Sequence, residues 1–311
     1  MSKFAFVFPG QGSQSLGMMN AYGDSSVIRQ TFAEASDALG RDLWQLVCQG
    51  PSDALNQTVN TQPLMLTAGV ACYRLWLARG GPQPALVAGH SLGEYSALVA
   101  SGVLDFKDAV PLVELRARAM QEAVPAGEGA MAAILGLDAA AVTAACAASA
   151  QGQVVEAVNF NAPEQIVIAG HCAAVERAAA ACKAMGAKRA LLLQVSAPFH
   201  CSLMQPAAER LAQRLSELKF SPPRIPVVNN VDALCLAAPD LIRDALVRQA
   251  ASPVRWVATM QLLAAEGVDQ VFECGPGKVL AGLVKRCCDG LAGAAMADLA
   301  GIEAALAAVK G

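Results

Sequence analysis

One sequence feature constrains the fold of this chain more than any other. It is a short apolar run that leads into a serine with a glycine two residues away on either side. The run is Ala85–Gly89, the pattern Gly89-His-Ser-Leu-Gly93 overlaps its end, and a helical pattern follows directly. A serine on such a strand-to-helix turn has a strained backbone, and the small residues on either side let the chain pass without clashes. Its side chain is then exposed at a helix start, where N–H groups favour a developing anion. The alternative is a structural turn whose serine caps the helix, because the five-residue pattern alone is weak.

Buried strands alternate with helices along much of the chain. Residues 4–8 form an apolar run closed by Pro9-Gly10, and residues 61–78 have apolar side chains at helical spacing. Further strands are predicted at 225–228 and 270–273, and a last helix at 302–310. This alternation predicts an α/β fold with a parallel sheet covered by helices.

The middle of the chain follows a different order. Strands are predicted at 130–135, 153–159, 165–169 and 188–193, and helices at 138–148 and 173–185. The order β-α-β-β-α-β is that of the ferredoxin-like, or split-βαβ, unit. We therefore expect a discontinuous catalytic domain of residues 1–125 and 197–311, with residues 126–196 as an inserted small domain.

Composition excludes several classes of protein. Hydrophobic residues make up 55% and charged residues 16%, so the chain is not disordered, and a net charge of −3 argues against a nucleic-acid partner. There is no uninterrupted apolar run of 18 residues, so we expect no membrane partner. The ten cysteines include no CxxC pair, which indicates buried thiols in a reducing compartment and no metal site. The apolar run at 4–8 is too short for a signal peptide, so we expect a cytoplasmic protein, and a monomer.

A nucleophilic serine needs a base, and the chain has three histidines. His90 is adjacent to Ser91, so its side chain should point elsewhere, and His171 is predicted to be a surface cap in the insert. His200 lies where the chain returns from the insert to the main domain, a crevice of the kind in which sites form. By elimination His200 is the best candidate base, although a lone histidine is more often a satisfied core or loop residue.

Arg116 is predicted to face inward on a helix over residues 106–121, with Asp105 as N-cap. It falls on an apolar stripe with 109, 112, 113, 117 and 120, whereas Arg118 lies four residues after Glu114 on the solvated face. A buried guanidinium needs an anion, because burying it unpaired is costly. The partner is either a protein carboxylate or a ligand carboxylate held by two parallel hydrogen bonds.

Several motifs together resemble the malonyl-CoA:acyl carrier protein transacylase family, the acyltransferases of fatty acid and polyketide synthesis. They extend in the family's order from residue 4 to about residue 285. They are Phe6-Val-Phe-Pro-Gly-Gln-Gly-Ser-Gln14, Gly89-His-Ser-Leu-Gly-Glu-Tyr-Ser96, Val113-Glu-Leu-Arg116 with Met120-Gln121, Asn159-Phe-Asn161, Pro198-Phe-His200, Arg243-Asp-Ala-Leu-Val-Arg-Gln249 and Gly275-Pro-Gly-Lys-Val-Leu280.

The resemblance implies an α/β-hydrolase-like large domain with an inserted ferredoxin-like small domain. It implies transfer of malonyl from malonyl-CoA to the phosphopantetheine thiol of acyl carrier protein, in a ping-pong reaction without cofactor or metal, for fatty acid synthesis. Ser91 matches the nucleophile and His200 the base. The backbone carbonyl of Gln249 matches the group that orients the histidine. The remaining matches are the backbone N–H groups of Gln11 and Leu92, for the oxyanion hole, and Arg116, for the malonyl carboxylate.

Other readings compete with this one. Within the class, the chain could belong to polyketide assembly or be the transacylase subunit of a malonate decarboxylase. An esterase or lipase also uses GxSxG, but such an enzyme usually has its histidine late in the chain, and no histidine follows His200. A non-catalytic binding module leaves Ser91, His200 and Arg116 unconnected.

Overall fold

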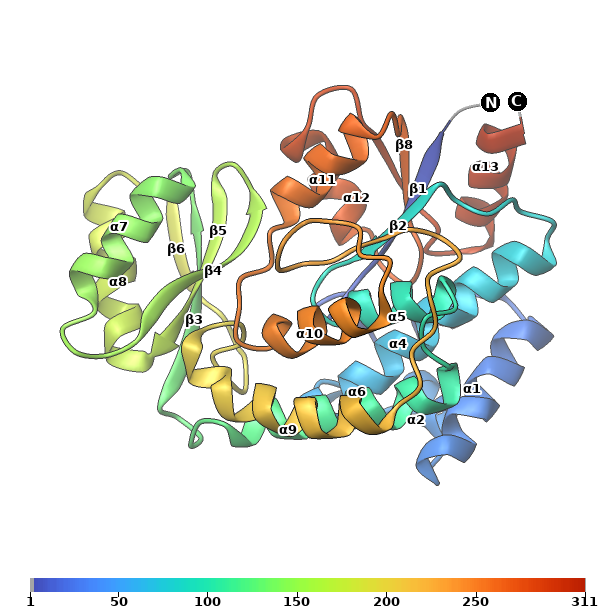
Figure 1. Cartoon of the computed structure of the whole chain (residues 1–311), viewed down its shortest axis with the longest axis horizontal. Coiled ribbons are helices and arrows are strands. Elements are labelled where there is room, and N and C mark those ends of the chain that lie inside the picture. The colour runs from blue at the N-terminus through green and yellow to red at the C-terminus, as the bar shows by residue number, and fades with distance from the viewer. Residues whose placement is uncertain (1–2, 311) are drawn as a thin grey trace.

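The computed structural model describes residues 3–310 as two sheets with helices packed on them (Figure 1). The first sheet has five parallel strands in the order β7-β2-β1-β8-β9. These strands are β1 (Phe4–Phe8), β2 (Leu86–Gly89), β7 (Val227–Val228), β8 (Gln270–Glu273) and β9 (Ala292–Ala295). Their helices are α1 (Ser26–Leu39), α2 (Leu43–Gln49), α3 (Ser52–Leu55), α4 (Thr58–Ala78), α5 (Gly93–Ala100), α6 (Phe106–Glu122), α9 (Gln205–Glu217), α10 (Pro239–Gln249), α11 (Trp256–Ala265), α12 (Val279–Cys287) and α13 (Leu299–Lys310), with 3-10 turns at Asn20–Tyr22 and Ser202–Met204.

The central strand β1 is buried on both faces, which explains its uninterrupted apolar sequence. Alternate side chains of a strand point to opposite faces. Phe6 packs edge-on against Trp76 of α4, with ring centroids 5.1 Å apart. On the other face, Val7 belongs to a core that includes Trp256 of α11 and Leu280 of α12. The predicted parallel sheet covered by helices is therefore confirmed.

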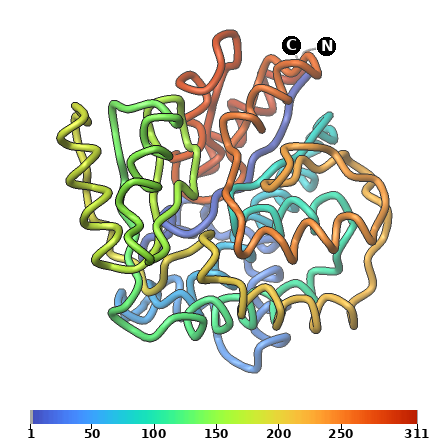
Figure 2. The backbone as a smooth tube through the Cα atoms, turned by 60° about the vertical axis from the view of Figure 1, so that its left-hand side comes forward, coloured from blue at the N-terminus to red at the C-terminus, as the bar shows by residue number. Residues whose placement is uncertain are grey.

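The second sheet is antiparallel, in the order β4-β5-β3-β6. Its core joins the sheet to α7 and α8, and these segments stand together at one end of the molecule (Figure 2). The element order is β-α-β-β-α-β: β3 (Gly129–Leu135), α7 (Ala139–Ser149), β4 (Val155–Ala162), β5 (Gln165–His171), α8 (Cys172–Ala184) and β6 (Arg189–Leu192).

The chain enters and leaves this second sheet at one point. A Cβ built on Gly129, where β3 begins, would lie 2.4 Å from Cδ of Pro198, shortly after β6. The segment between Gly129 and Pro198 therefore leaves the part of the chain that contains the parallel sheet and returns to it at the same place. Both of its connections lead toward the cavity described below, because α6 precedes it and His200 follows it.

The observed elements differ from the predicted ones mostly at their ends. Strand β7 is two residues long, and β9 was not predicted. Helix α6 continues through Pro111, and Asp105 caps it by accepting a hydrogen bond from the Lys107 N–H at 2.8 Å. Within residues 3–310, no helix combines the length and the apolar character needed to cross a bilayer.

Candidate active site

Three adjacent strands of the parallel sheet deliver the polar groups of the candidate site. β1 is followed by the loop with Gln11, β2 by Ser91 and β7 by Asn230. The carboxyl ends of parallel strands meet at one edge of a sheet, which is where ligand sites form in open α/β folds. Asn230 secures the serine turn, since its Oδ1 accepts from the Ser91 N–H at 2.7 Å and its Nδ2 donates to the Gly89 carbonyl at 2.7 Å.

Close packing of the backbone explains the two glycines around Ser91. A Cβ on Gly89 would lie 1.9 Å from the carbonyl carbon of Gly93, and a Cβ on Gly93 would lie 2.0 Å from the Phe8 oxygen. Ser91 itself has φ of 52°, a conformation that costs a non-glycine residue about 1–2 kcal/mol. Its hydroxyl makes no cap on α5 and instead contacts a histidine.

Ser91 and His200 form a hydrogen-bonded pair. The Ser91 Oγ lies 2.7 Å from Nε2 of His200, and the Nδ1 of this ring lies 2.9 Å from the Gln249 backbone oxygen. Because that carbonyl only accepts, Nδ1 carries the proton and Nε2 is free to accept from the serine. Burial, together with the nearby Arg116 charge, lowers the pKa of His200 to about 3. The imidazole is therefore neutral at neutral pH, the form a general base requires.

The guanidinium of Arg116 lies beside the Ser91 hydroxyl. Its side chain is 1% exposed. One terminal nitrogen donates to Gln62 Oε1 at 2.9 Å, and the other donates to Ser91 Oγ at 3.1 Å and to Gln249 Oε1 at 2.9 Å. Its Nε has no hydrogen-bond partner in the described chain, and no carboxylate of residues 3–310 lies within ion-pair distance. The predicted inward stripe of α6 is confirmed, and Arg118 pairs with Glu114 at the surface.

Three buried polar residues behind the site were not predicted: Gln62, Glu94 and Asn230. Gln62 is on α4, and Glu94 is in the first turn of α5. Glu94 Oε2 accepts from the Gln249 side-chain Nε2 at 2.8 Å and from the Asn230 N–H at 3.0 Å. No local signal in the sequence marks Glu94 as buried, because a carboxylate in the first turn of a helix is ordinarily solvated.

Ser91, His200, Arg116 and Gln62 line a cavity of about 540 Å³. Gln11 and Leu92 also line it, and neither backbone N–H has a hydrogen-bond partner within residues 3–310. A Cβ on Gly10 would lie 3.7 Å from the Leu92 nitrogen, so the two loops that carry these amides are in contact. The remaining wall is mostly apolar and polar uncharged, including Met120, Met131, Asn159, Leu193, Val195 and Phe199.

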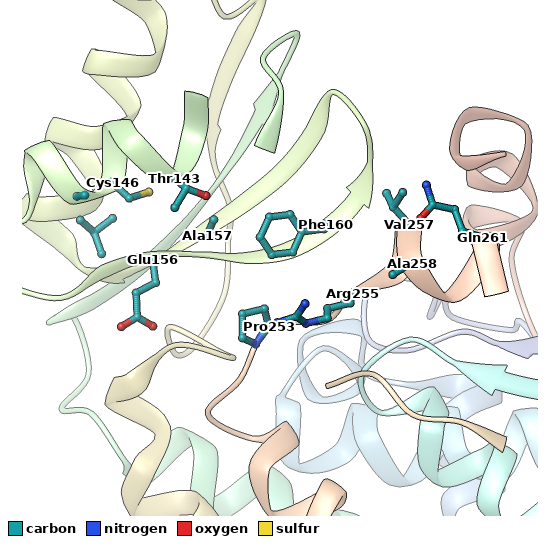
Figure 3. Close-up of a pocket in the computed structure, with 12 residues that line it drawn as sticks. Thr143, Cys146, Glu156, Ala157, Phe160, Pro253, Arg255, Val257, Ala258 and Gln261 are labelled. Atoms are coloured by element: carbon teal, nitrogen blue, oxygen red, sulfur yellow. The ribbon is translucent and has the colours of Figure 1, made fainter. Parts of the chain in front are cut away.

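A second cavity, of about 650 Å³, lies between α7, β4 and the start of α11 (Figure 3). Its walls are mainly apolar, and Phe160 and Pro253 face into it. The Glu156 carboxylate there already accepts from the Ser202 N–H at 2.9 Å and the Ser202 hydroxyl at 2.7 Å. This cavity has no nucleophile paired with a base, so it is not the candidate active site.

The other two histidines have different hydrogen-bond partners, although His90 also lines the cavity. His90 Nε2 lies 2.7 Å from Asn161 Oδ1. His171 was predicted to be a surface cap, but its side chain does not cap α8; its Nδ1 accepts from the Val154 N–H at 3.0 Å. Within residues 3–310 there is no cluster of three metal-ligating side chains.

The parallel α/β sheet, the serine turn and the serine–histidine pair define the class of enzymes that transfer or hydrolyse acyl groups. The acyl transferase domain model matches residues 5–305, so the chain belongs to this family. Among curated relatives, the malonyl CoA-acyl carrier protein transacylase of Escherichia coli (strain K12) is 59% identical, over 98% of this chain and 99% of that protein. The protein of the same name from Bacillus subtilis (strain 168) is 45% identical, over 100% of this chain and 98% of that one. The resemblance predicted from the motifs is confirmed.

Solved structures of this family have the same fold as this chain. An acyl-carrier-protein S-malonyltransferase from Burkholderia pseudomallei 1710b superposes with a TM-score of 0.97 at 59% identity, covering 98% of this chain and 99% of that one. A malonyl-transacylase solved in complex with a holo type II PKS acyl-carrier protein has a TM-score of 0.97 at 56% identity, covering 99% and 100%. In both cases at least 98% of each chain is covered, so the similarity extends over nearly the whole chain.

Proposed function

We propose that this acyltransferase moves malonyl from malonyl-CoA to the phosphopantetheine thiol of an acyl carrier protein, through an ester on Ser91, and thereby supplies fatty acid synthesis. The observation that carries the proposal is one cavity in which a serine–histidine pair and a buried arginine without a carboxylate partner meet. The names of the relatives, and the carrier protein in one neighbouring structure, support the two substrates.

In the first half-reaction, Ser91 Oγ attacks the thioester carbonyl carbon while His200 Nε2 takes the hydroxyl proton. The carbonyl oxygen becomes an oxyanion, and the free N–H groups of Gln11 and Leu92 are the donors for it. Collapse of this intermediate breaks the carbon–sulfur bond, and the imidazolium returns the proton to the sulfur of coenzyme A. The products are malonyl-Ser91 and free coenzyme A, with a neutral imidazole restored.

The second half-reaction is the reverse with a different thiol. His200 takes the proton of the phosphopantetheine thiol, and the sulfur attacks the Ser91 ester. Collapse gives malonyl-carrier protein, and the proton returns to Ser91 Oγ. The backbone carbonyl of Gln249 keeps the imidazole in one tautomer throughout, in place of a carboxylate. A kinetic pattern of the ping-pong type follows, since coenzyme A leaves before the carrier protein reacts.

Arg116 is the group proposed to bind the free carboxylate of malonyl. A guanidinium offers two parallel N–H groups to a carboxylate, and the Arg116 Nε is buried without a partner. An esterase acting on neutral esters has no use for such a cation beside its serine. This is the physical reason for preferring transfer of a dicarboxylic acyl group over ester hydrolysis.

The finer architecture is also part of the proposal. We assign residues 1–125 and 197–311 to one α/β-hydrolase-like domain and residues 126–196 to a ferredoxin-like insert, supported by the β4-β5-β3-β6 order. The cavity opens between them, because Met120 of α6 and Met131 of β3 both line it. We propose further that the enzyme acts as a cytoplasmic monomer without a cofactor.

The test is intact-mass spectrometry on the whole chain. Incubation with malonyl-CoA should add one malonyl group, and added holo carrier protein should remove it and gain the same mass. The variant Ser91→Ala should show no adduct. The proposal fails if wild type acquires no malonyl, or if the Ala variant is labelled as fully as wild type.

A further inference from the structure

Glu94 is a buried carboxylate that the proposed reaction does not use. It is 1% exposed and lies on α5, three residues after Ser91. A carboxylate is rarely buried unless hydrogen bonds compensate its lost hydration. Here one oxygen, Oε2, accepts two hydrogen bonds, from the Gln249 side chain and the Asn230 backbone.

The contact with Gln249 decides how the side-chain amide of that residue is oriented. Its Nε2 faces two acceptors, Glu94 Oε2 at 2.8 Å and the Ser91 carbonyl at 3.0 Å. Its Oε1 faces a donor, the Arg116 guanidinium, at 2.9 Å. Rotating the amide by 180° would place NH₂ against the guanidinium and oxygen against both acceptors, so all three hydrogen bonds would be lost.

We propose that Glu94 is a positioning residue for acyl-group selectivity, which fixes the Gln249 side-chain amide so that its oxygen holds Arg116 beside Ser91. The inference rests on the proposed function, because it presupposes that Arg116 binds the malonyl carboxylate. Within residues 3–310 Arg116 makes no ion pair, and its terminal nitrogens are held by Gln62, Gln249 and the Ser91 hydroxyl, with the centroid of the Tyr95 ring 5.3 Å from the guanidinium carbon. Of these supports, Gln249 is the one to which Glu94 is hydrogen-bonded.

An acceptor oxygen at this position is what the arrangement needs. Burial raises the pKa of Glu94 to about 7, against the opposing effect of the Gln249 and Asn230 hydrogen bonds. Near neutral pH both protonation states are therefore populated, and Oε2 can accept in either when the proton is on the other oxygen. Glutamine in place of Glu94 keeps one acceptor oxygen of the same reach, whereas methionine keeps the volume and removes it.

Glu94 also supports the serine turn, through Asn230. Loss of that support should slow loading of every acyl group by the same factor, because Ser91 attacks them all. Loss of the Gln249 contact should instead slow malonyl loading more than acetyl loading, because only malonyl needs Arg116. The ratio of the two rates therefore separates positioning of Arg116 from general structural support.

The experiment compares Glu94→Met, Glu94→Gln and the control Glu273→Met in rates of loading from malonyl-CoA and acetyl-CoA. Glu273 is an equally buried glutamate whose pKa burial also raises to about 7, and its carboxylate accepts from the Ala281 N–H at 2.8 Å, at the start of α12. We expect Glu94→Met to lower the malonyl-to-acetyl ratio about 10-fold or more, the loss of about one hydrogen bond's discrimination. Glu94→Gln and Glu273→Met should stay within about 3-fold of wild type.

A ratio unchanged in folded Glu94→Met overturns the inference, and so does a ratio that falls equally in Glu94→Gln. If Glu94→Met does not fold, Glu94→Asp, which withdraws the carboxylate by one methylene, must lower the ratio instead. In an Arg116→Ala background, Glu94→Met should no longer change the ratio, since coupled residues are not additive. If the wild-type enzyme does not load malonyl, the proposed function itself is refuted. If wild type and Glu94→Met both prefer malonyl to acetyl to the same degree, only the role of Glu94 is refuted.

Discussion

Replacing Arg116 by alanine should convert a malonyl-selective enzyme into one with little preference between malonyl and acetyl. A malonyl thioester differs from an acetyl thioester by one carboxylate, which the proposed mechanism assigns to the Arg116 guanidinium. Each charge-assisted hydrogen bond contributes about 1.5–3 kcal/mol, and about 1.4 kcal/mol corresponds to a factor of ten. Removing the pair of hydrogen bonds, about 3–6 kcal/mol together, should therefore slow malonyl loading by about 100- to 10,000-fold.

Acetyl loading should change much less. Arg116 also donates to Ser91 Oγ at 3.1 Å, so its loss removes one hydrogen bond from the nucleophile with either substrate. That common loss cancels in the malonyl-to-acetyl ratio, which makes the ratio the quantity to measure. Arg116→Lys should recover little, because an ammonium cannot present two parallel N–H groups from a planar fork.

The assay is the rate of acyl-enzyme formation, followed by rapid quench and intact mass, with each thioester separately. Arg118→Ala is the matched control, since Arg118 lies on the same helix but its side chain is 58% exposed and pairs with Glu114. The control should keep the wild-type ratio. A ratio that Arg116→Ala leaves unchanged would show that the guanidinium has a purely structural role, and the argument for a dicarboxylic acyl group would lose its basis.

Three further predictions concern the base, the pH profile and the turn. His200→Ala should slow loading by about 100- to 10,000-fold, whereas His171→Ala should load at nearly the normal rate, as measured by the same quench assay. Because the pKa of His200 is lowered to about 3, kcat/KM for malonyl loading should not fall with a midpoint near 6.5 as pH decreases from 8 to 5; such a midpoint, absent from a non-enzymatic control, would contradict the neutral buried imidazole. Gly93→Ala should lower the free energy of unfolding by several kcal/mol, because its Cβ would lie 2.0 Å from the Phe8 oxygen, whereas Gly282→Ala, in open space on α12, should raise it by about 0.5–1 kcal/mol in denaturant titrations.

Features encoded by neighbouring residues could be predicted from the sequence. The inward face of α6 follows from helical spacing alone, so the burial of Arg116 needed no knowledge of the rest of the chain. The serine turn is similar, because glycine at both flanking positions is a local steric requirement. Strands β1 and β8 were also predicted with their observed bounds, since each is a short buried run.

Features that depend on long-range pairing could not be predicted. Glu94 opens a helix, where a carboxylate is ordinarily a solvated residue that interacts favourably with the helix dipole. Its burial depends on Gln249, 155 residues away in sequence. Strand β9 consists of alanine and glycine, which have low β-propensity, and it is a strand because it pairs with β8.

The excursion of the chain through the second sheet has a consequence for biosynthesis. Ser91 is translated before this segment, and His200 and the Gln249 carbonyl only after it. On the proposed mechanism, a nascent chain that has not yet passed these residues carries the nucleophile without its base, so its acylation on the ribosome should be slowed about 100- to 10,000-fold. Since Gly129 and Pro198 adjoin, the intervening segment can fold as a closed loop without straining its neighbours. The serine–histidine pair therefore forms only late in synthesis, because His200 follows Ser91 by more than a hundred residues.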